Sequence, residues 1–242
     1  DILRFHSWVG GDRDGNPNVN SEITRYAIKK QISVLVNKYL VDLDNLFDDL
    51  SIHIDESIDN ANLTQSIEED LNIINIDKNI IQRYQYEPLR LKVLCIKQKL
   101  IDYNDSIFSK KILYNLEKFQ NDLNIISEFL LKISDDDYLL KGILKDILVR
   151  SKTFGLNFVS LDIRQHSETH EYAIDEIIKH AKPDVKYSEL KETQKCDLLE
   201  SLILAANNEF IFDKNKLSNV SNEVMNTFKI IKEAYDIDKS LI

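Results

Sequence analysis

Three of the five glycines in this 242-residue chain lie in one short run, from Gly10 to Pro17. Gly10, Gly11 and Gly15 permit positive φ angles or a close approach of backbones, and Pro17 restricts the way the chain leaves the run. The other residues of the run are polar: Asp12, Arg13, Asp14 and Asn16. A buried structural turn rarely needs two acids and an arginine. The run therefore predicts a defined loop that faces a ligand.

The sequence of this loop resembles the start of a calcium-binding EF-hand loop. Counted from Asp12, an EF-hand loop needs glycine at its sixth position and a bidentate glutamate at its twelfth. This chain has Pro17 and Ile23 there, and a strand rather than a helix is predicted before the loop. We therefore reject calcium binding as the role of the loop.

The composition is that of an ordinary globular protein, with 43% hydrophobic and 30% charged residues. A formal net charge of −10 argues against nucleic acid as a partner, because no basic stripe is present to neutralise phosphates. Cys95 and Cys196 have no metal-binding spacing and are expected to be reduced thiols. No apolar run approaches the ~20 residues of a membrane span, and no signal peptide is visible. These features predict a cytoplasmic protein without a membrane or nucleic-acid partner.

Hydrophobic periodicity divides the chain into two strands and many helices. Residues 2–9 and 156–164 alternate as strands do, and the glycine loop 10–17 follows the first of them. Ser21 is the expected N-cap of a long helix, and residues 51–79 match no clear pattern. The apolar face of that helix is expected to hold Ile28, Ile32, Leu35, Tyr39, Leu43, Leu46 and Leu50.

Further helices are expected on both sides of the second strand, giving helices over 21–151 and again over 168–235. Their predicted ranges are 85–103, 109–133, 135–151, 168–181, 188–206 and 221–235. Glu87 and Arg90 are predicted to form a pair within the first of these helices. Two strands are marginal as an isolated sheet. We therefore expect them to join other strands in a larger sheet.

Three blocks of this sequence resemble the family of phosphoenolpyruvate carboxylases. The first is SWVGGDRDGNPNVNSEITR, beginning at Ser7. The second runs from Thr153 to Gln165 as TFGLNFVSLDIRQ and is followed by Ser167 and His170. The third and weaker block is the sequence EPLR at residues 87–90. The blocks appear in the order typical of that family and extend over most of the chain.

The resemblance implies that residues 1–242 are an internal segment of one larger catalytic domain, built around an eight-stranded α/β barrel of the TIM type. Functional groups of such barrels lie at the C-terminal ends of the strands, where both main blocks are located. The implied activity converts phosphoenolpyruvate and bicarbonate to oxaloacetate and phosphate, in a homotetramer that uses Mg²⁺ or Mn²⁺. The family's catalytic histidine lies before this segment and its metal ligands after it. The segment alone is therefore expected to be inactive.

Arg164, Trp8 and Arg13 are the candidates for substrate binding, and the resemblance implies that role for Arg164 and Trp8. Arg164 ends a strand, where a buried guanidinium needs an anionic partner, which the residues alone allow to be either a phosphate or Asp162. The resemblance favours phosphate binding. Trp8 is expected to form an apolar wall that holds bicarbonate or CO₂ away from water, rather than to fill the core. For Arg13, substrate contact and an ion pair with Asp12 or Asp14 both remain open.

The remaining polar residues of the two blocks are expected to orient these three side chains: Asp12, Asp14, Asn16 and Asp162. A non-catalytic helical interaction module or scaffold remains the alternative function, supported by the many amphipathic helices. Convergence of Trp8, Arg13 and Arg164 on one concave surface would favour the enzyme, and their dispersal would favour the scaffold.

Overall fold

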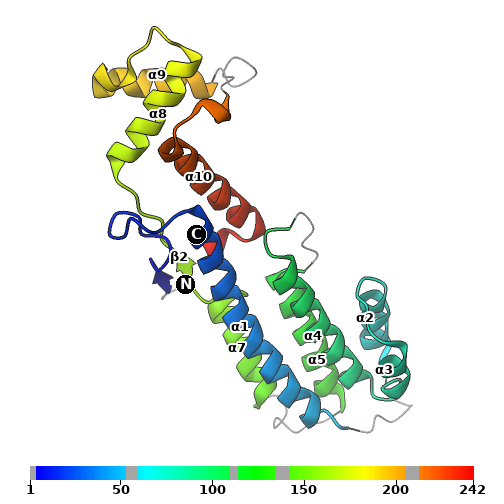
Figure 1. Ribbon diagram of the computed structural model, residues 1–242. Coiled ribbons are helices and arrows are strands. Elements are labelled where there is room, and N and C mark those ends of the chain that lie inside the picture. The colour runs from blue at the N-terminus through cyan, green and yellow to red at the C-terminus, as the bar shows by residue number, and fades with distance from the viewer. Residues whose placement is uncertain (1–3, 53–58, 110–113, 134–141, 205–212) are drawn as a thin grey trace. The chain divides into compact units, whose positions relative to one another are not determined.

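The computed structural model is built almost entirely of helices (Figure 1). It describes residues 4–52, 59–109, 114–133, 142–204 and 213–242. Within these ranges the chain forms many helices and two short strands, which confirms the prediction of a mainly helical chain. No helix in the described ranges is long and apolar enough to cross a membrane.

Contacts divide the chain into two compact units. Unit 1 comprises Asp1–Phe5 and Lys29–Ser160, and unit 2 comprises His6–Ile28 and Leu161–Ile242. Most of α1 (Ser21–Asp49) belongs to unit 1. The other helices of unit 1 are α2 (Ala61–Leu71), α3 (Lys78–Arg83), α4 (Pro88–Ser106), α5 (Leu116–Ile133) and α7 (Ile143–Phe154).

Unit 2 carries the glycine loop and the C-terminal helices. Its strands are β1 (His6–Ser7) and the end of β2 (Ser160–Leu161). Its α-helices, after the first residues of α1, are α8 (Ser167–Ala181), α9 (Glu192–Leu204) and α10 (Asn219–Ile237). Single 3₁₀ turns lie at Tyr187–Glu189, Lys214–Lys216 and Lys239–Leu241.

Helix α1 follows its predicted pattern, apart from its cap. Every apolar residue assigned to its inner face, from Ile28 to Leu50, is buried, with at most 3% of its surface exposed. The helix begins at Ser21, and the side-chain oxygen of Asn20 accepts a hydrogen bond from the Ile23 amide at 2.9 Å. The prediction of Ser21 as N-cap was therefore wrong by one residue. Ser21 instead donates its amide and hydroxyl protons to the carboxylate of Glu223.

Helices α2 and α3 form where the sequence showed no clear pattern, although residues 53–58 lie outside the described ranges. Helix α2 buries Leu63, Ile67 and Asp70, which share one face at spacings of four and three residues. Because the third residue of this face, Asp70, is an acid, the apolar spacing that would predict a helix extends over only two residues. Helix α4 behaves as expected, and Arg90 forms the predicted pair with Glu87 at 3.0 Å.

The acid on α2 belongs to a buried ionic cluster that joins three helices. The ammonium group of Lys92 on α4 lies 2.7 Å from Asp70 on α2 and 2.7 Å from Asp122 on α5. Lys99, seven residues further along α4, contacts the same two carboxylates. The hydroxyl of Tyr114 donates to Asp122 at 2.6 Å. Burial alone would lower the pKa of Lys92, but the facing carboxylates of Asp122 and Asp70 raise its pKa overall.

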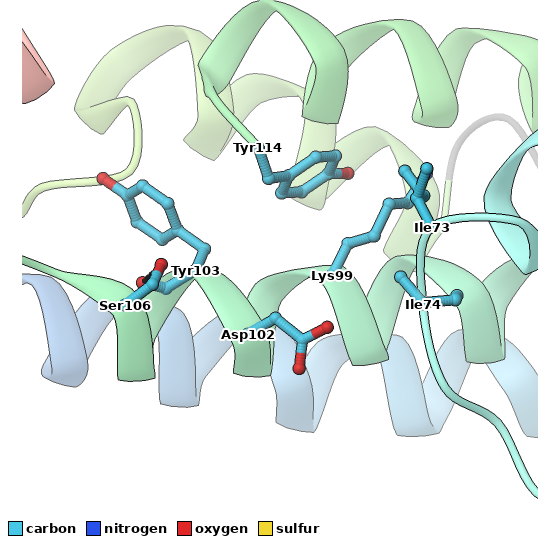
Figure 2. Close-up of a pocket in the computed structure, with 7 residues that line it drawn as sticks. All are labelled: Ile73, Ile74, Lys99, Asp102, Tyr103, Ser106 and Tyr114. Atoms are coloured by element: carbon cyan, nitrogen blue, oxygen red, sulfur yellow. Dashed lines mark hydrogen bonds between the residues drawn. The ribbon is translucent and has the colours of Figure 1, made fainter. Parts of the chain in front are cut away.

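A cavity of about 110 Å³ lies beside this cluster in unit 1. Figure 2 shows Lys99 reaching from α4 toward Tyr114, while Ile73 and Ile74 approach from the loop after α2. The Lys99 ammonium lies 5.1 Å from the centre of the Tyr114 ring. Lys99 therefore contacts the ionic cluster and also lines this cavity.

The two cysteines should differ sharply in their reactivity toward a thiol reagent. Cys95 is fully buried, and burial raises the pKa of its thiol to about 12, whereas Cys196 is exposed. Because the thiolate is the reactive form, we expect one fast-reacting thiol in the folded chain and a second only after denaturation. Timed absorbance measurements with an aromatic disulfide reagent check this. Two fast thiols, or a fast phase that survives Cys196→Ser, would contradict the burial of Cys95.

The strands are much shorter than predicted. Of residues 4–9 only His6 and Ser7 are in β1, and of residues 156–164 only Ser160 and Leu161 are in β2; residues 2–3 lie outside the described ranges. The amide of Asp162 donates to Ser7 at 2.8 Å. Beyond this point the hydrogen bonds between the two strands are interrupted, because the amides of Gly11 and Asp12 donate to the carbonyl of Trp8 instead.

Pairing resumes after the interruption. Asp12 and Arg164 form an isolated parallel bridge, in which the Arg164 amide donates to Gly11 at 2.9 Å. The Arg13 amide donates in turn to the Arg164 carbonyl at 3.0 Å. The two blocks that carry the family resemblance are thus held together by main-chain hydrogen bonds within unit 2.

Candidate functional site

The glycine loop requires glycine at two positions, as the sequence predicted. Gly10 has a φ of +87°, in the left-handed region that side chains disfavour. A Cβ atom added to Gly11 would lie 2.1 Å from the carbonyl oxygen of Asp162, a backbone atom that cannot move aside. Gly11 therefore lets the loop contact the segment after β2 directly.

The polar residues of the loop hold its shape. One carboxylate oxygen of Asp12 accepts the amides of Asp14 and Gly15 at 3.2 and 3.1 Å. The side chain of Asn16 accepts the Asn18 amide at 3.0 Å. Asp14 lies 2.7 Å from the imidazole of His166, which joins the loop to the start of α8. These contacts have the form expected of residues that orient their neighbours.

Arg164 and Trp8 lie together on the surface of unit 2. The guanidinium carbon of Arg164 lies 4.7 Å from the centre of the Trp8 ring, within the range of a cation–π contact. Trp8 is 54% exposed, so it does not fill the core. Stacking occupies one face of the guanidinium group and leaves its in-plane N–H donors available.

The expected burial of Arg164 needs correction, and the disfavoured alternative of a salt bridge to Asp162 is not observed in the described ranges. The side chain of Arg164 is exposed, so the inference that a buried guanidinium there needs an anion was wrong. In the described ranges it also forms no salt bridge with Asp162. That carboxylate lies 3.0 Å from Nδ1 of His6 instead. The role of Arg164 therefore depends on its exposed position beside Trp8 and not on burial.

Arg13 is located differently from Arg164. Only 6% of its surface is exposed, and its guanidinium donates to the hydroxyl of Thr24 at 2.7 Å and to the carbonyl of Gly11 at 3.4 Å. In the described ranges it makes no ion pair with Asp12 or Asp14. Burial lowers the pKa of Arg13, and the charge of Glu223 partly opposes this shift. The structure thus brings Trp8 and Arg164 together and places the Arg13 side chain in the interior.

The sequence analysis gave no role to Gln165 or His170, which line a cavity together with Arg13. The alternation that predicted a strand around Arg164 contains the signal for Gln165, because neighbouring side chains of an extended segment point to opposite sides. His170, on α8, follows the second block of the family resemblance, but the sequence assigned it no chemistry. The described ranges contain no group of three or more His, Cys, Asp or Glu side chains that could hold a metal ion.

Residues 1–239 match the phosphoenolpyruvate carboxylase family. The phosphoenolpyruvate carboxylase of Rhodothermus marinus is 28% identical over 244 residues, covering 100% of this chain and 26% of that protein. The one of Prochlorococcus marinus (strain MIT 9301) is 31% identical over 255 residues, covering 96% of this chain and 25% of that protein. The chain therefore spans about a quarter of the length of these relatives. On the extent of these matches, the chain belongs to the phosphoenolpyruvate carboxylase family.

Proposed function

We propose that the protein containing this chain converts phosphoenolpyruvate and bicarbonate into oxaloacetate and phosphate. Family membership supports the reaction, because the named relatives are phosphoenolpyruvate carboxylases and match nearly all of this chain. At the level of residues, the main support is the exposed Arg164 guanidinium stacked on Trp8 beside the glycine loop. We propose that this pair, the substrate surface, contacts the substrates.

Arg164 suits the phosphate group of phosphoenolpyruvate. A guanidinium offers parallel N–H donors in a planar fork, which matches two oxygens of a phosphoryl group. The Trp8 ring holds this fork from one face, so its orientation is set before the substrate arrives. During transfer the charge on the phosphoryl oxygens is redistributed, and a donor fixed in advance stabilises that change.

Trp8 suits the second half of the reaction. An oxygen of bicarbonate attacks phosphorus while the bond from phosphorus to the enol oxygen breaks, giving carboxyphosphate and the enolate of pyruvate. Carboxyphosphate then separates into phosphate and CO₂, and the enolate carbon forms the new bond to CO₂. An indole ring beside the phosphate-binding guanidinium gives CO₂ an apolar wall and keeps water away from the enolate.

We also propose the wider features that the family implies. The parallel pairing between the glycine loop and residues 162–164 is compatible with two neighbouring strands of an α/β barrel in one larger catalytic domain. The protein is proposed to be a cytoplasmic homotetramer. When bound, Mg²⁺ or Mn²⁺ would stabilise charge on the enolate; the described residues offer no cluster for it, and no step above depends on it.

Removal of the Trp8 ring should uncouple the two halves of the reaction. In the whole protein, Trp8→Ala should still release phosphate, but part of the CO₂ should escape before the enolate captures it. The ratio of phosphate released to oxaloacetate formed should therefore rise several-fold above that of the wild type, whatever happens to the overall rate. Parallel phosphate and oxaloacetate assays measure this ratio.

A matched control for this experiment is Tyr86→Ala, which removes an aromatic ring that is 83% exposed in unit 1. The control should keep the ratio of the wild type. If both products fall equally in Trp8→Ala, the ring serves only to support Arg164 and does not retain CO₂.

A further inference from the structure

Unit 2 contains a cavity of about 160 Å³ that lies apart from the substrate surface. Its polar lining comes from Arg13, Gln165, His170 and Thr227, and its apolar lining includes Val224, Phe228 and Ile231 of α10. The His170 and Phe228 rings lie 5.6 Å apart. The loop, the segment after β2 and two helices thus line one space whose α10 wall is mostly apolar.

The cavity and the substrate surface lie on opposite sides of the same short segment. Ile163 and Gln165 line the cavity, whereas Asp162 contacts His6 and Arg164 contacts Trp8. This alternation is the period of two expected for an extended backbone, in which successive side chains point in opposite directions. A molecule in the cavity therefore does not occupy the position that we propose for the phosphate of the substrate.

Arg13 determines the charge of the ligand that the cavity can bind. Arg13 is 94% buried, and its two hydrogen-bond partners, Thr24 and Gly11, are both neutral. Its Nε atom has no hydrogen-bond partner in the described ranges. The carboxylate of Glu223 raises the pKa of Arg13 by its charge, but it already accepts two hydrogen bonds from Ser21. A buried cation with an unpaired N–H group and no salt bridge in the described ranges is a position where an anion binds favourably.

The remaining walls of the cavity restrict what that anion can be. A cavity of about 150 Å³ accommodates a molecule the size of benzene, that is, about six non-hydrogen atoms. Val224 and Ile231 make the α10 wall mostly apolar, and the Thr227 hydroxyl on that wall already donates to the carbonyl of Glu223, so a bare inorganic anion would be poorly matched there. A carboxylate, in contrast, combines a planar anionic end with a carbon chain. Gln165 adds an amide that can donate to its second oxygen.

We propose that this cavity is a binding site for a small monocarboxylic acid with an apolar chain of three or four carbons. Its carboxylate pairs with Arg13 and Gln165, and its chain packs against Val224 and Ile231. This site is independent of the proposed carboxylase reaction, because it faces away from Arg164.

Titration of the 242-residue chain with butyrate tests this site. Chemical-shift changes of backbone amides in nuclear magnetic resonance spectra should saturate with a dissociation constant on the order of 1 mM, and should be largest around Arg13, Gln165 and α10. Butyramide has the same chain without the charge, and inorganic phosphate has charge without the chain. Each of these compounds should bind at least about tenfold more weakly than butyrate.

Two variants locate the site, and a third separates it from the substrate surface. Arg13→Met should weaken butyrate binding at least about tenfold by removing the cation, and Val224→Phe should do the same by filling the apolar end. Val224→Phe leaves every polar contact of the loop in place, so it remains informative if Arg13→Met fails to fold. Arg164→Ala should leave butyrate binding unchanged, even if the proposed carboxylase function is wrong.

Several outcomes would overturn the site. These are the absence of saturable butyrate binding, equal binding of butyrate and butyramide, tighter binding of phosphate, or full affinity in a folded Val224→Phe variant. Loss of butyrate binding in Arg164→Ala would place the carboxylate on the substrate surface and would equally refute a separate cavity site.

Discussion

Replacement of Arg164 by lysine should lower kcat of the whole protein for oxaloacetate formation roughly a hundredfold, which corresponds to about 3 kcal/mol of transition-state stabilisation. Lysine keeps the positive charge and can still lie over the Trp8 ring, so any role that needs only charge or stacking is preserved. What lysine loses is the planar fork that grips two phosphoryl oxygens at once. The loss should appear in kcat as well as in KM, because charge on the phosphoryl group changes during transfer.

The matched control is Arg83→Lys. Arg83 is also exposed and stacked on an aromatic ring, with its guanidinium carbon 5.5 Å from the centre of Tyr84, but it lies on α3 in unit 1. Steady-state kinetics of this control should match those of the wild type. Near-normal kcat in a folded Arg164→Lys variant would refute the phosphate role and leave Arg164 as a partner for Trp8 alone.

Replacement of Lys92 by methionine should lower the free energy of unfolding of the 242-residue chain by about 3–5 kcal/mol. The variant removes the ammonium group that lies 2.7 Å from both Asp70 and Asp122. Two buried carboxylates then face Lys99 alone, and the hydroxyl of Ser66 loses its charged donor as well. Urea denaturation followed by circular dichroism measures the change. A loss below about 1 kcal/mol would contradict the buried cluster.

Two further variants show whether the loss comes from unpaired charge. Lys97→Met, on the same helix, removes a partner of the exposed Asp44 and should lower the free energy of unfolding by less than about 1 kcal/mol. In the double variant Lys92→Met with Asp70→Leu, Lys99 and Asp122 remain as one pair at 2.6 Å. Because this variant restores the charge balance, it should recover a large part of the stability lost by Lys92→Met alone.

The contribution of Lys92 should also depend on pH in a defined direction. Its pKa is raised in the folded state above the ordinary value of 10.5. The folded state therefore binds the proton more tightly, and the stabilisation is fully present below 10.5 and is lost as the pH rises through the raised pKa. The stability difference between wild type and Lys92→Met should accordingly be constant near neutral pH and should narrow only in strongly alkaline solution.

The sequence by itself determined the parts of this protein that depend on local repetition. A period of 3.6 residues identified the buried face of α1 from Ile28 to Leu46, because a helix places every third or fourth residue on one side whatever it packs against. The need for glycine at positions 10 and 11 was also visible, since glycine is the residue that tolerates positive φ and close backbone contact.

Tertiary structure decided whatever depends on pairing between distant residues. Asp70 interrupts the apolar face of α2, and only the approach of Lys92 from α4 makes it a core residue. The lengths of β1 and β2 likewise depend on where the loop turns back to Trp8. Arg13 and Arg164 are both candidates for substrate contact in the sequence. Their side chains separate because one lies against Thr24 in the interior and the other on Trp8 at the surface, contacts that local repetition does not encode.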